Sequence, residues 1–316
     1  MQLIRNLVLA AVATGLGLSA ADPALLKLVP QDAAFIAGIH ADQIKTSRFG
    51  QFLLDQLKTE EDKLEKLITV TGFDPRRDLT EVVVASSDTR GRGGKTLVIA
   101  KGRFDPARVS SFLASEGGAK LAYQGIDIIG KNSGTSGGLA FLDATTALAG
   151  DLDFLKAAID RSRQGSSAMD PAMANRITEL STRYDAWIFS SSVDRVADDL
   201  RDSRLKGAMN GALMQSMQSV AGGVRFGASV ELMAEGVMRS EKDATAMVDV
   251  VRFLASMLQL NRDKDEKAAD LAELLEKAEV KANGNQFRML LNVPEDLLER
   301  VMKPATLRRK RPAGVI

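Results

Sequence analysis

Short apolar runs alternate along this chain with segments whose apolar residues recur at helical spacing. The run over residues 33–39 has the length and composition of a buried strand. Farther along, Ala246, Val250 and Leu254 recur every fourth residue, as on one face of a helix. Asn283-Gly284 is a strong signal for a tight hairpin turn. Runs of both kinds predict an α+β fold in which antiparallel hairpins pack against helices.

Further strands are predicted at residues 81–87 and 95–101, which form a hairpin, and around a turn at Gln124-Gly125. Residues 224–232 alternate strictly between apolar and other residues, which predicts one strand with one buried face. Helices are predicted over residues 106–115, from Asp151, where Leu155 and Ile159 point inward, and from Pro294.

Four Asp-Pro pairs indicate where helices begin. An aspartate side chain accepts hydrogen bonds from the first-turn amides, and a proline in the next position has no amide to leave unpaired. We interpret all four pairs as structural. They are Asp22-Pro23, Asp74-Pro75, Asp105-Pro106 and Asp170-Pro171.

The second half of the chain repeats the order of predicted elements found in the first half. The sequence over residues 185–189, Asp-Ala-Trp-Ile-Phe, resembles the sequence over residues 32–36, Asp-Ala-Ala-Phe-Ile. Every methionine after the initiator lies at Met169 or beyond, which favours a boundary just before it. We predict two similar tandem α+β units. The predicted segments are a signal peptide at 1–21, a first unit at 22–165, a second unit at 166–303 and a basic disordered tail at 304–316.

The first residues have the pattern of a secretory signal. Arg5 precedes an apolar stretch that ends near Leu18, shorter than the roughly 20 residues that span a bilayer. Ser19-Ala20-Ala21 then supplies small residues for a signal peptidase, so we predict cleavage before Asp22 and a periplasmic or secreted protein. An uncleaved anchor and a buried N-terminal helix are the alternatives. No later segment has the pattern of a transmembrane helix.

Composition excludes several functional classes. The chain has no cysteine, which excludes disulfides, thiolate catalysis and cysteine-ligated metals. Loss of Arg5 with the signal takes the formal net charge of +1 to about zero, so no global field attracts nucleic acid. We predict neither a cofactor nor a nucleic-acid partner.

Catalytic candidates are few. His40 is the only histidine, and its place at the end of a predicted strand favours a hydrogen-bonded boundary residue over a catalyst. Ser136 lies in a G-x-S-x-G pattern, but the residues after it have a strand pattern where a nucleophile elbow needs a helix. We therefore assign no catalytic, metal-binding or cofactor-binding residue, and an enzyme is the less favoured interpretation.

Met209, Leu213 and Met217 recur at helical spacing in the methionine-rich second half. Such a stripe is usually core. It also fits an apolar groove, because unbranched thioether side chains adapt to varied ligands.

Three short motifs carry a family resemblance. They are Pro30-x-Asp32-Ala33, Gly72-Phe73-Asp74-Pro75 and Gly102-Arg103-Phe104-Asp105-Pro106. Together with the signal pattern, they make the chain resemble uncharacterised exported α+β proteins of soil bacteria such as acidobacteria. The resemblance spans most of the chain and implies export and an α+β repeat, with no known activity.

We predict a non-catalytic exported binding or structural protein of the bacterial envelope, with an envelope protein or polymer as its partner. Two alternatives stay open. One is a periplasmic hydrolase, which would need a cleft that gathers His40 with Ser136 or with acids. The other is a carrier of an apolar ligand in the second half.

Overall fold

The computed structural model describes residues 21–47, 51, 61–87, 94–130, 137–164, 169–191, 211–227, 229–262 and 266–302. The first twenty residues of the predicted signal peptide and the predicted basic tail lie outside this part of the chain.

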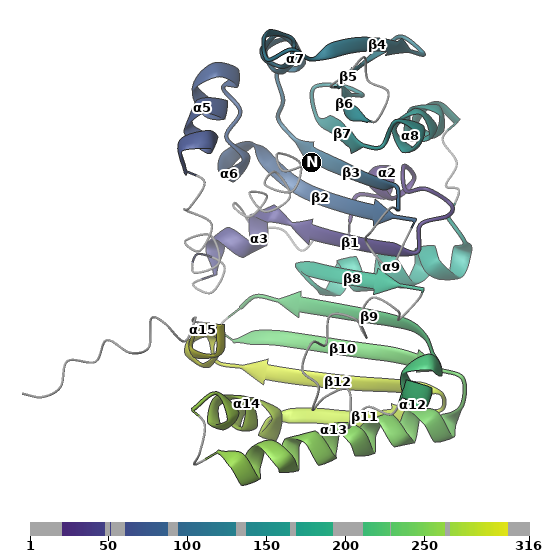
Figure 1. Ribbon diagram of the computed structural model, residues 1–316, viewed down its shortest axis with the longest axis vertical. Coiled ribbons are helices and arrows are strands. Elements are labelled where there is room, and N and C mark those ends of the chain that lie inside the picture. The colour runs from purple at the N-terminus through teal and green to yellow at the C-terminus, as the bar shows by residue number, and fades with distance from the viewer. Residues whose placement is uncertain are drawn as a thin grey trace, which may run out of the picture.

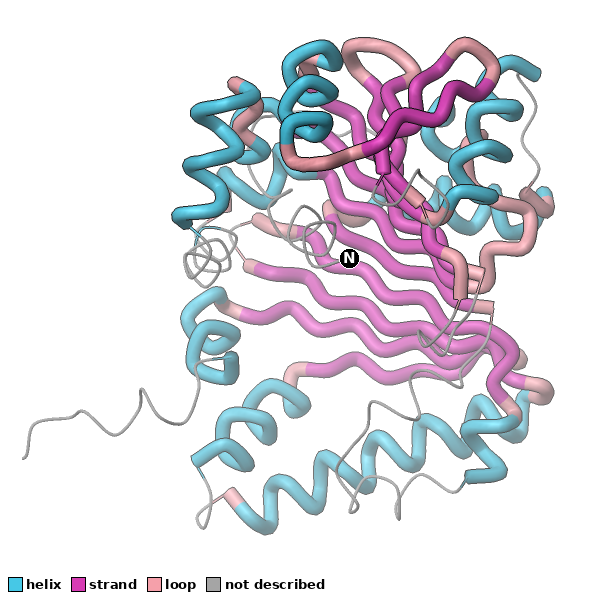
Figure 2. The backbone as a smooth tube through the Cα atoms, turned by 45° about the horizontal axis from the view of Figure 1, so that its top comes forward, coloured by secondary structure: helices cyan, strands magenta, loops and turns pink. Residues whose placement is uncertain are grey.

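Twelve described strands form one sheet in the order β11-β12-β10-β9-β8-β1-β2-β3-β7-β6-β5-β4. Every neighbouring pair is antiparallel. Figure 2 shows the strands as a continuous layer from one end of the molecule to the other. Their bounds are β1 Phe35–His40, β2 Leu79–Ser86, β3 Thr96–Gly102, β4 Ala119–Tyr123, β5 Ile126–Gly130, β6 Gly138–Phe141, β7 Thr146–Gly150, β8 Ala186–Ser190, β9 Met217–Arg225, β10 Val230–Met238, β11 Ala278–Asn283 and β12 Gln286–Val293.

Helices cover both faces of this sheet (Figure 1). One face, called here the α9 face, carries α2 Pro23–Leu26, α8 Leu152–Gln164 and α9 Pro171–Arg183, and their buried side chains join one large core cluster. The opposite face, called the α13 face, is covered in the second half by the remaining C-terminal helices. These are α12 Gly211–Gln215, α13 Glu241–Asn261, α14 Glu266–Glu276 and α15 Glu295–Met302.

The described residues of the first half form four further helices. Phe73, beside α6, packs on the α13 face of the sheet with Val82 and Val98. The bounds of these helices are α3 Ala41–Thr46, α5 Glu61–Thr71, α6 Pro75–Asp78 and α7 Pro106–Ser115.

The two halves of the chain meet where β1 pairs with β8. Gly38 lies opposite Trp187 in this pair, and the next strand places Gly223 opposite Trp187 on its other side. The Trp187 ring lies against Gly38, and the Tyr184 ring lies against Gly223. A Cβ atom at either glycine would come within 2.4 Å of a ring carbon. Two glycines thus make room for two buried aromatic rings at the junction of the halves.

The prediction of an α+β fold is confirmed. All four Asp-Pro pairs begin helices, and in each the aspartate side chain accepts hydrogen bonds from first-turn amides. The strand at 33–39, the hairpin of 81–87 with 95–101, the helices at 106–115 and from Asp151, and the turn at Gln124-Gly125 are confirmed as well. Asn283-Gly284 joins β11 to β12, and Gly284 has a φ of 55°, which glycine adopts at little steric cost.

The single strand predicted over residues 224–232 is wrong. β9 ends at Arg225 and β10 begins at Val230, so the alternating stretch crosses a hairpin. Leu232 pairs with Val224, and partners in an antiparallel pair point to the same face. Val224, Val230 and Leu232 therefore pack into one cluster on the α13 face even though they belong to two strands.

No helix in the described ranges is both long enough and apolar enough to cross a membrane.

Replacing Gly38 with alanine tests the packing at the junction. The new Cβ would lie 2.3 Å from Cε2 of Trp187, so the ring must shift, and overpacking of this kind costs about 1–3 kcal/mol. We expect the free energy of unfolding, measured by urea denaturation, to fall by that amount. Gly227→Ala is the control, because its new Cβ meets only an ordinary contact at 3.5 Å. Equal stability of the two variants would refute this account of the junction.

Candidate functional site

A cleft of about 260 Å³ opens on the α9 face, where α9 lies beside the strands of the second half. Charged and neutral polar side chains contribute most of its lining, with a smaller apolar part. Its lining residues are Arg176, Glu179, Phe189, Ser219, Ala221, Glu235, Val237, Gln286 and Arg288.

The floor of the cleft comes from two neighbouring cross-strand rows of the sheet. In one row, β8 to β12 place Phe189, Ala221, Glu235 and Arg288 opposite one another in turn. In the next row, Ser219, Val237 and Gln286 lie in the same relation. Side chains of directly opposed residues point to the same face, so strand register alone brings these groups together.

Helix α9 forms the wall of the cleft and is fixed at several points. Asp170 caps its first turn by accepting hydrogen bonds from the amides of Ala172 and Met173. Ile177 and Leu180 bury its apolar side in the core. Arg176 and Glu179, on another side of the same helix, line the cleft.

Two arginine–glutamate contacts also tie α9 to β10. Arg176 Nη2 donates to Oε1 of Glu235 at 2.5 Å, and Arg183 Nη2 donates to Oε1 of Glu231 at 3.4 Å. The two glutamates are four residues apart on one strand and therefore share a face, while the arginines are two helical turns apart. Both glutamates are buried, so these contacts satisfy charges that would be costly if left alone.

Glu235 is the centre of the charge arrangement in the cleft. Its carboxylate lies between Arg176 and Arg288, whose Nε is 3.2 Å from Oε2. Arg176 also contacts Glu179 Oε2 at 2.5 Å, so its charge is shared between two carboxylates. The carboxylate of Glu235 is nearly enclosed, whereas Glu179 is largely exposed.

Arg288 differs from Arg176 in how it contacts Glu235. The Nε of Arg288 is close enough to Glu235 for an ion pair, but within the described residues it makes no hydrogen bond, because the N–H does not point at the carboxylate oxygen. The side chain is 36% exposed. Arg288 thus places a partly exposed positive charge at the cleft, while its unpaired Nε is itself buried.

This arrangement can bind an anion and orient it. Arg288 offers a planar set of donors, while Gln286 and Ser219 offer neutral donors and acceptors beside it. The described residues contain no group of three or more acidic or histidine side chains placed to hold a metal ion.

A second polar cluster lies on the α9 face of the sheet, on strands β1, β2 and β3 of the first half. Strand register places His40, Glu81 and Lys101 opposite one another on β1, β2 and β3. Glu81 is only 6% exposed, and burial raises its pKa to about 7, while the hydrogen bond from the amide of Asp22 acts in the opposite direction. Lys101 forms an ion pair with the side chain of Asp22.

His40 lies at the boundary between β1 and α3, as predicted. Its Nε2 is 3.2 Å from the carbonyl oxygen of Ser181 on α9, and its backbone N–H donates to the carbonyl of Asp185. Burial lowers the pKa of His40 and raises the pKa of Asp185. His40 therefore lies near two acids, Glu81 and Asp185, but it does not line the cleft, and Ser136 lies outside the described residues.

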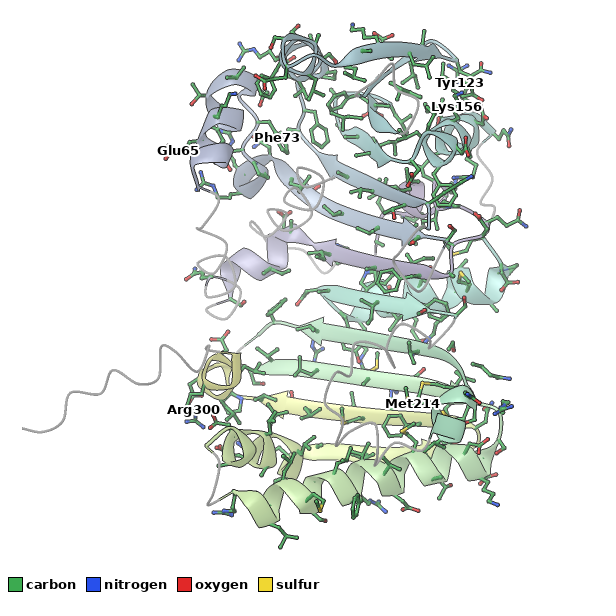
Figure 3. The ribbon with its side chains drawn as sticks, in the orientation of Figure 1. Glu65, Phe73, Tyr123, Lys156, Met214 and Arg300 are labelled. Atoms are coloured by element: carbon green, nitrogen blue, oxygen red, sulfur yellow. The ribbon has the colours of Figure 1, made fainter. Side chains whose placement is uncertain are left out.

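The predicted apolar groove falls only partly within the described residues. Met209 lies outside them. Leu213 is buried against α13, and Met217 packs against the same cluster together with Met214, labelled in Figure 3. None of these residues lines the cleft. The groove stays a prediction.

Reasoning from sequence missed the cleft entirely. Its charged residues come from α9, β10 and β12, which are far apart in the chain. The spacing of Glu231 and Glu235 puts two acids on one face of β10, but the strand predicted from sequence stopped at residue 232 and did not include Glu235. Acidic side chains on the buried face of a strand need positively charged partners. Arg288, on β12, is one of these partners.

Comparisons with known proteins add little. No family model matches the sequence, and no curated protein matches it. Among solved structures, one described as "Structure of crystal form I of TP0453" matches with a TM-score of 0.46 and 9% identity, over 90% of this chain and 97% of that one. A likeness of this degree says nothing about what the chain binds.

The glutamate at the centre of the cleft should be important for stability. Glu235→Gln keeps the shape of the side chain but removes the charge that compensates Arg176 and Arg288. Loss of this charge leaves two partly exposed arginines uncompensated, which costs about 1–3 kcal/mol. We expect the free energy of unfolding to fall by this amount in chemical denaturation. Glu179→Gln, a control at an exposed pair, should change it by less than about 0.5 kcal/mol, and an equal loss in both variants would contradict this assignment.

Proposed function

We propose that this chain is a non-catalytic binding protein whose cleft beside α9 takes a small molecule with a carboxylate group. The observation that supports this is the guanidinium group of Arg288, whose side chain lines the cleft and is 36% exposed. A guanidinium matches a carboxylate in two parallel hydrogen bonds, which gives both affinity and orientation.

The neighbouring groups restrict the ligand further. Glu179 carries a negative charge at the α9 side, so a ligand with a second carboxylate there would be repelled, whereas an amino group would be attracted. Gln286 and Ser219 can hydrogen-bond neutral polar groups. The arrangement therefore favours a small polar molecule with a carboxylate toward Arg288, with or without an amino group toward Glu179.

The size of the cleft agrees with a small ligand. Its volume of about 260 Å³ is just below the range of roughly 300–1,000 Å³ typical of small-molecule sites. A ligand the size of an amino acid, or the terminal residue of a peptide, is a better match than a polymer lying along the sheet.

A binding role is favoured over hydrolysis because His40 is away from the cleft. The acids near His40 are buried in the sheet, where a substrate would have to displace packed side chains. The carrier alternative would need a cavity beside the methionines of the second half, and Leu213 and Met217 instead contact packed side chains.

We further propose that the protein acts in the envelope or outside the cell. The support is the N-terminal sequence, with Arg5, a short apolar stretch and Ser19-Ala20-Ala21. We also propose that the chain arose by tandem duplication. From the central pair outward, β1-β2-β3-β7 and β8-β9-β10-β12 follow the same order, and in each set a helical segment lies between the third and fourth strands along the chain.

Binding can be tested with acetate and glycine as probes. We expect saturable shifts of the Arg288 side-chain N–H signal in NMR titrations, and loss of binding by tenfold or more, about 1.4 kcal/mol, in Arg288→Gln. Lys281→Gln is the matched control, since Lys281 lies opposite Arg288 on β11 but does not line the cleft. Absence of saturable binding for both probes, or equal loss in the control, would refute the proposal.

A further inference from the structure

The buried carboxylate of Glu81 is directed at a single backbone nitrogen. The nitrogen of Asp22 lies 3.1 Å from Oε2 and 3.3 Å from Oε1 of Glu81. Fifty-nine residues separate the two positions in the sequence, so the contact depends on the docking of α2 beside β3. An amide nitrogen has only one hydrogen to share between these two oxygens.

The surroundings of Glu81 leave its charge poorly compensated while that nitrogen is an amide. Lys101 lies opposite Glu81 on β3, but its ammonium pairs with the side chain of Asp22. His40 lies opposite Glu81 on β1, and its ring points to Ser181. These groups and Asp22 are the charged or titratable neighbours that the adjoining elements supply within the described residues. Burial therefore raises the pKa of Glu81 to about 7.

The nitrogen that Glu81 contacts is the one that signal-peptide cleavage would expose. Ser19-Ala20-Ala21 precedes it, with small residues at both positions that a signal peptidase reads. Cleavage after Ala21 converts the amide of Asp22 into an α-ammonium group with three hydrogens and a positive charge.

We infer that Glu81 is the binding site for the new N-terminus, and that cleavage before Asp22 completes a buried ion pair between the Asp22 α-ammonium and the Glu81 carboxylate. The ammonium can donate to both oxygens at once, which the amide cannot. The pair fastens α2 to β2 and to the core beneath it. This inference rests on the predicted cleavage site and is independent of what the cleft binds.

The burial of Ala21 also indicates whether cleavage or the docking of α2 comes first. Ala21 is 2% exposed and belongs to the main core cluster, so the bond to be cut lies under protein once α2 has docked. A peptidase needs an extended, accessible segment. Cleavage therefore precedes the docking of α2, and folding afterward places the new N-terminus on Glu81.

The two forms should lose stability over different ranges as pH rises. In the uncleaved form, the folded-state pKa of Glu81 lies above its ordinary value of 4.5. The stabilising contribution of the protonated carboxyl is then present below that value and is lost as pH rises to about 7. In the cleaved form, the pair raises the α-amino pKa above its ordinary value of about 7.7–8.0, so its contribution persists through neutral pH and is lost only above that range.

The test compares two full-length mature proteins. One begins at Asp22, released from a cleavable fusion, and the other retains Ala21 and one preceding residue, so that the nitrogen of Asp22 stays an amide. NMR titration of the Glu81 carboxyl carbon should give a pKa lower by about 1–3 units in the protein that begins at Asp22. The same pKa in both proteins would overturn the inference.

Two further measurements keep a folding defect from obscuring the result. In the protein that begins at Asp22, Glu81→Gln should return the α-amino pKa to its ordinary range, whereas Glu116→Gln, a control at an exposed pair with Lys66, should leave it raised. The intact mass of the protein exported by a bacterial host should correspond to a chain that begins at Asp22. A different first residue would also overturn the inference.

Discussion

The pairing of β1 with β8 is the interaction on which the rest of the structure depends. Among the described residues, it joins seven strands from the first half to five from the second half in one sheet. Trp187 is 2% exposed and lies against Gly38, and Tyr184 lies against Gly223. Large aromatic rings that pack over glycines bury more apolar area than small side chains at the same positions would bury. The main core cluster accordingly contains residues from both halves.

The cleft follows from this arrangement. Tyr184 caps the end of α9 and leads directly into β8, so the ring that packs on Gly223 also sets where the helix lies. With α9 in place, Arg176 and Arg183 reach the two buried glutamates of β10. Arg288 enters the same network from β12 through its ion pair with Glu235. The cleft is therefore a consequence of how α9 is held on the sheet.

Much of the fold was predictable because it depends on local chemistry. The Asp-Pro pairs begin helices through contacts within three residues of each aspartate. Asn283-Gly284 forms its hairpin because glycine tolerates a positive φ. The stretch at 224–232 was misread because alternation reports which face is buried, and an antiparallel hairpin can keep the same face across its turn.

The cleft was not predictable for the opposite reason. Arg176, Glu235 and Arg288 are brought together by strand register and by helix placement over more than fifty residues of separation. The same is true of Asp22 and Glu81. No local pattern encodes such pairs, although charged residues at inward positions of strands indicate that partners must exist. The single histidine drew attention in the sequence, yet it is hydrogen-bonded at a strand end.

The pairing of β1 with β8 should make the two halves unfold as one cooperative unit. Native-state hydrogen exchange can test this cooperativity. The account predicts that amides of β1, β2, β8 and β9 share the highest protection and lose it together, with the same dependence on denaturant. Two groups of amides, one in each half, that open with different free energies and different denaturant dependence would contradict it.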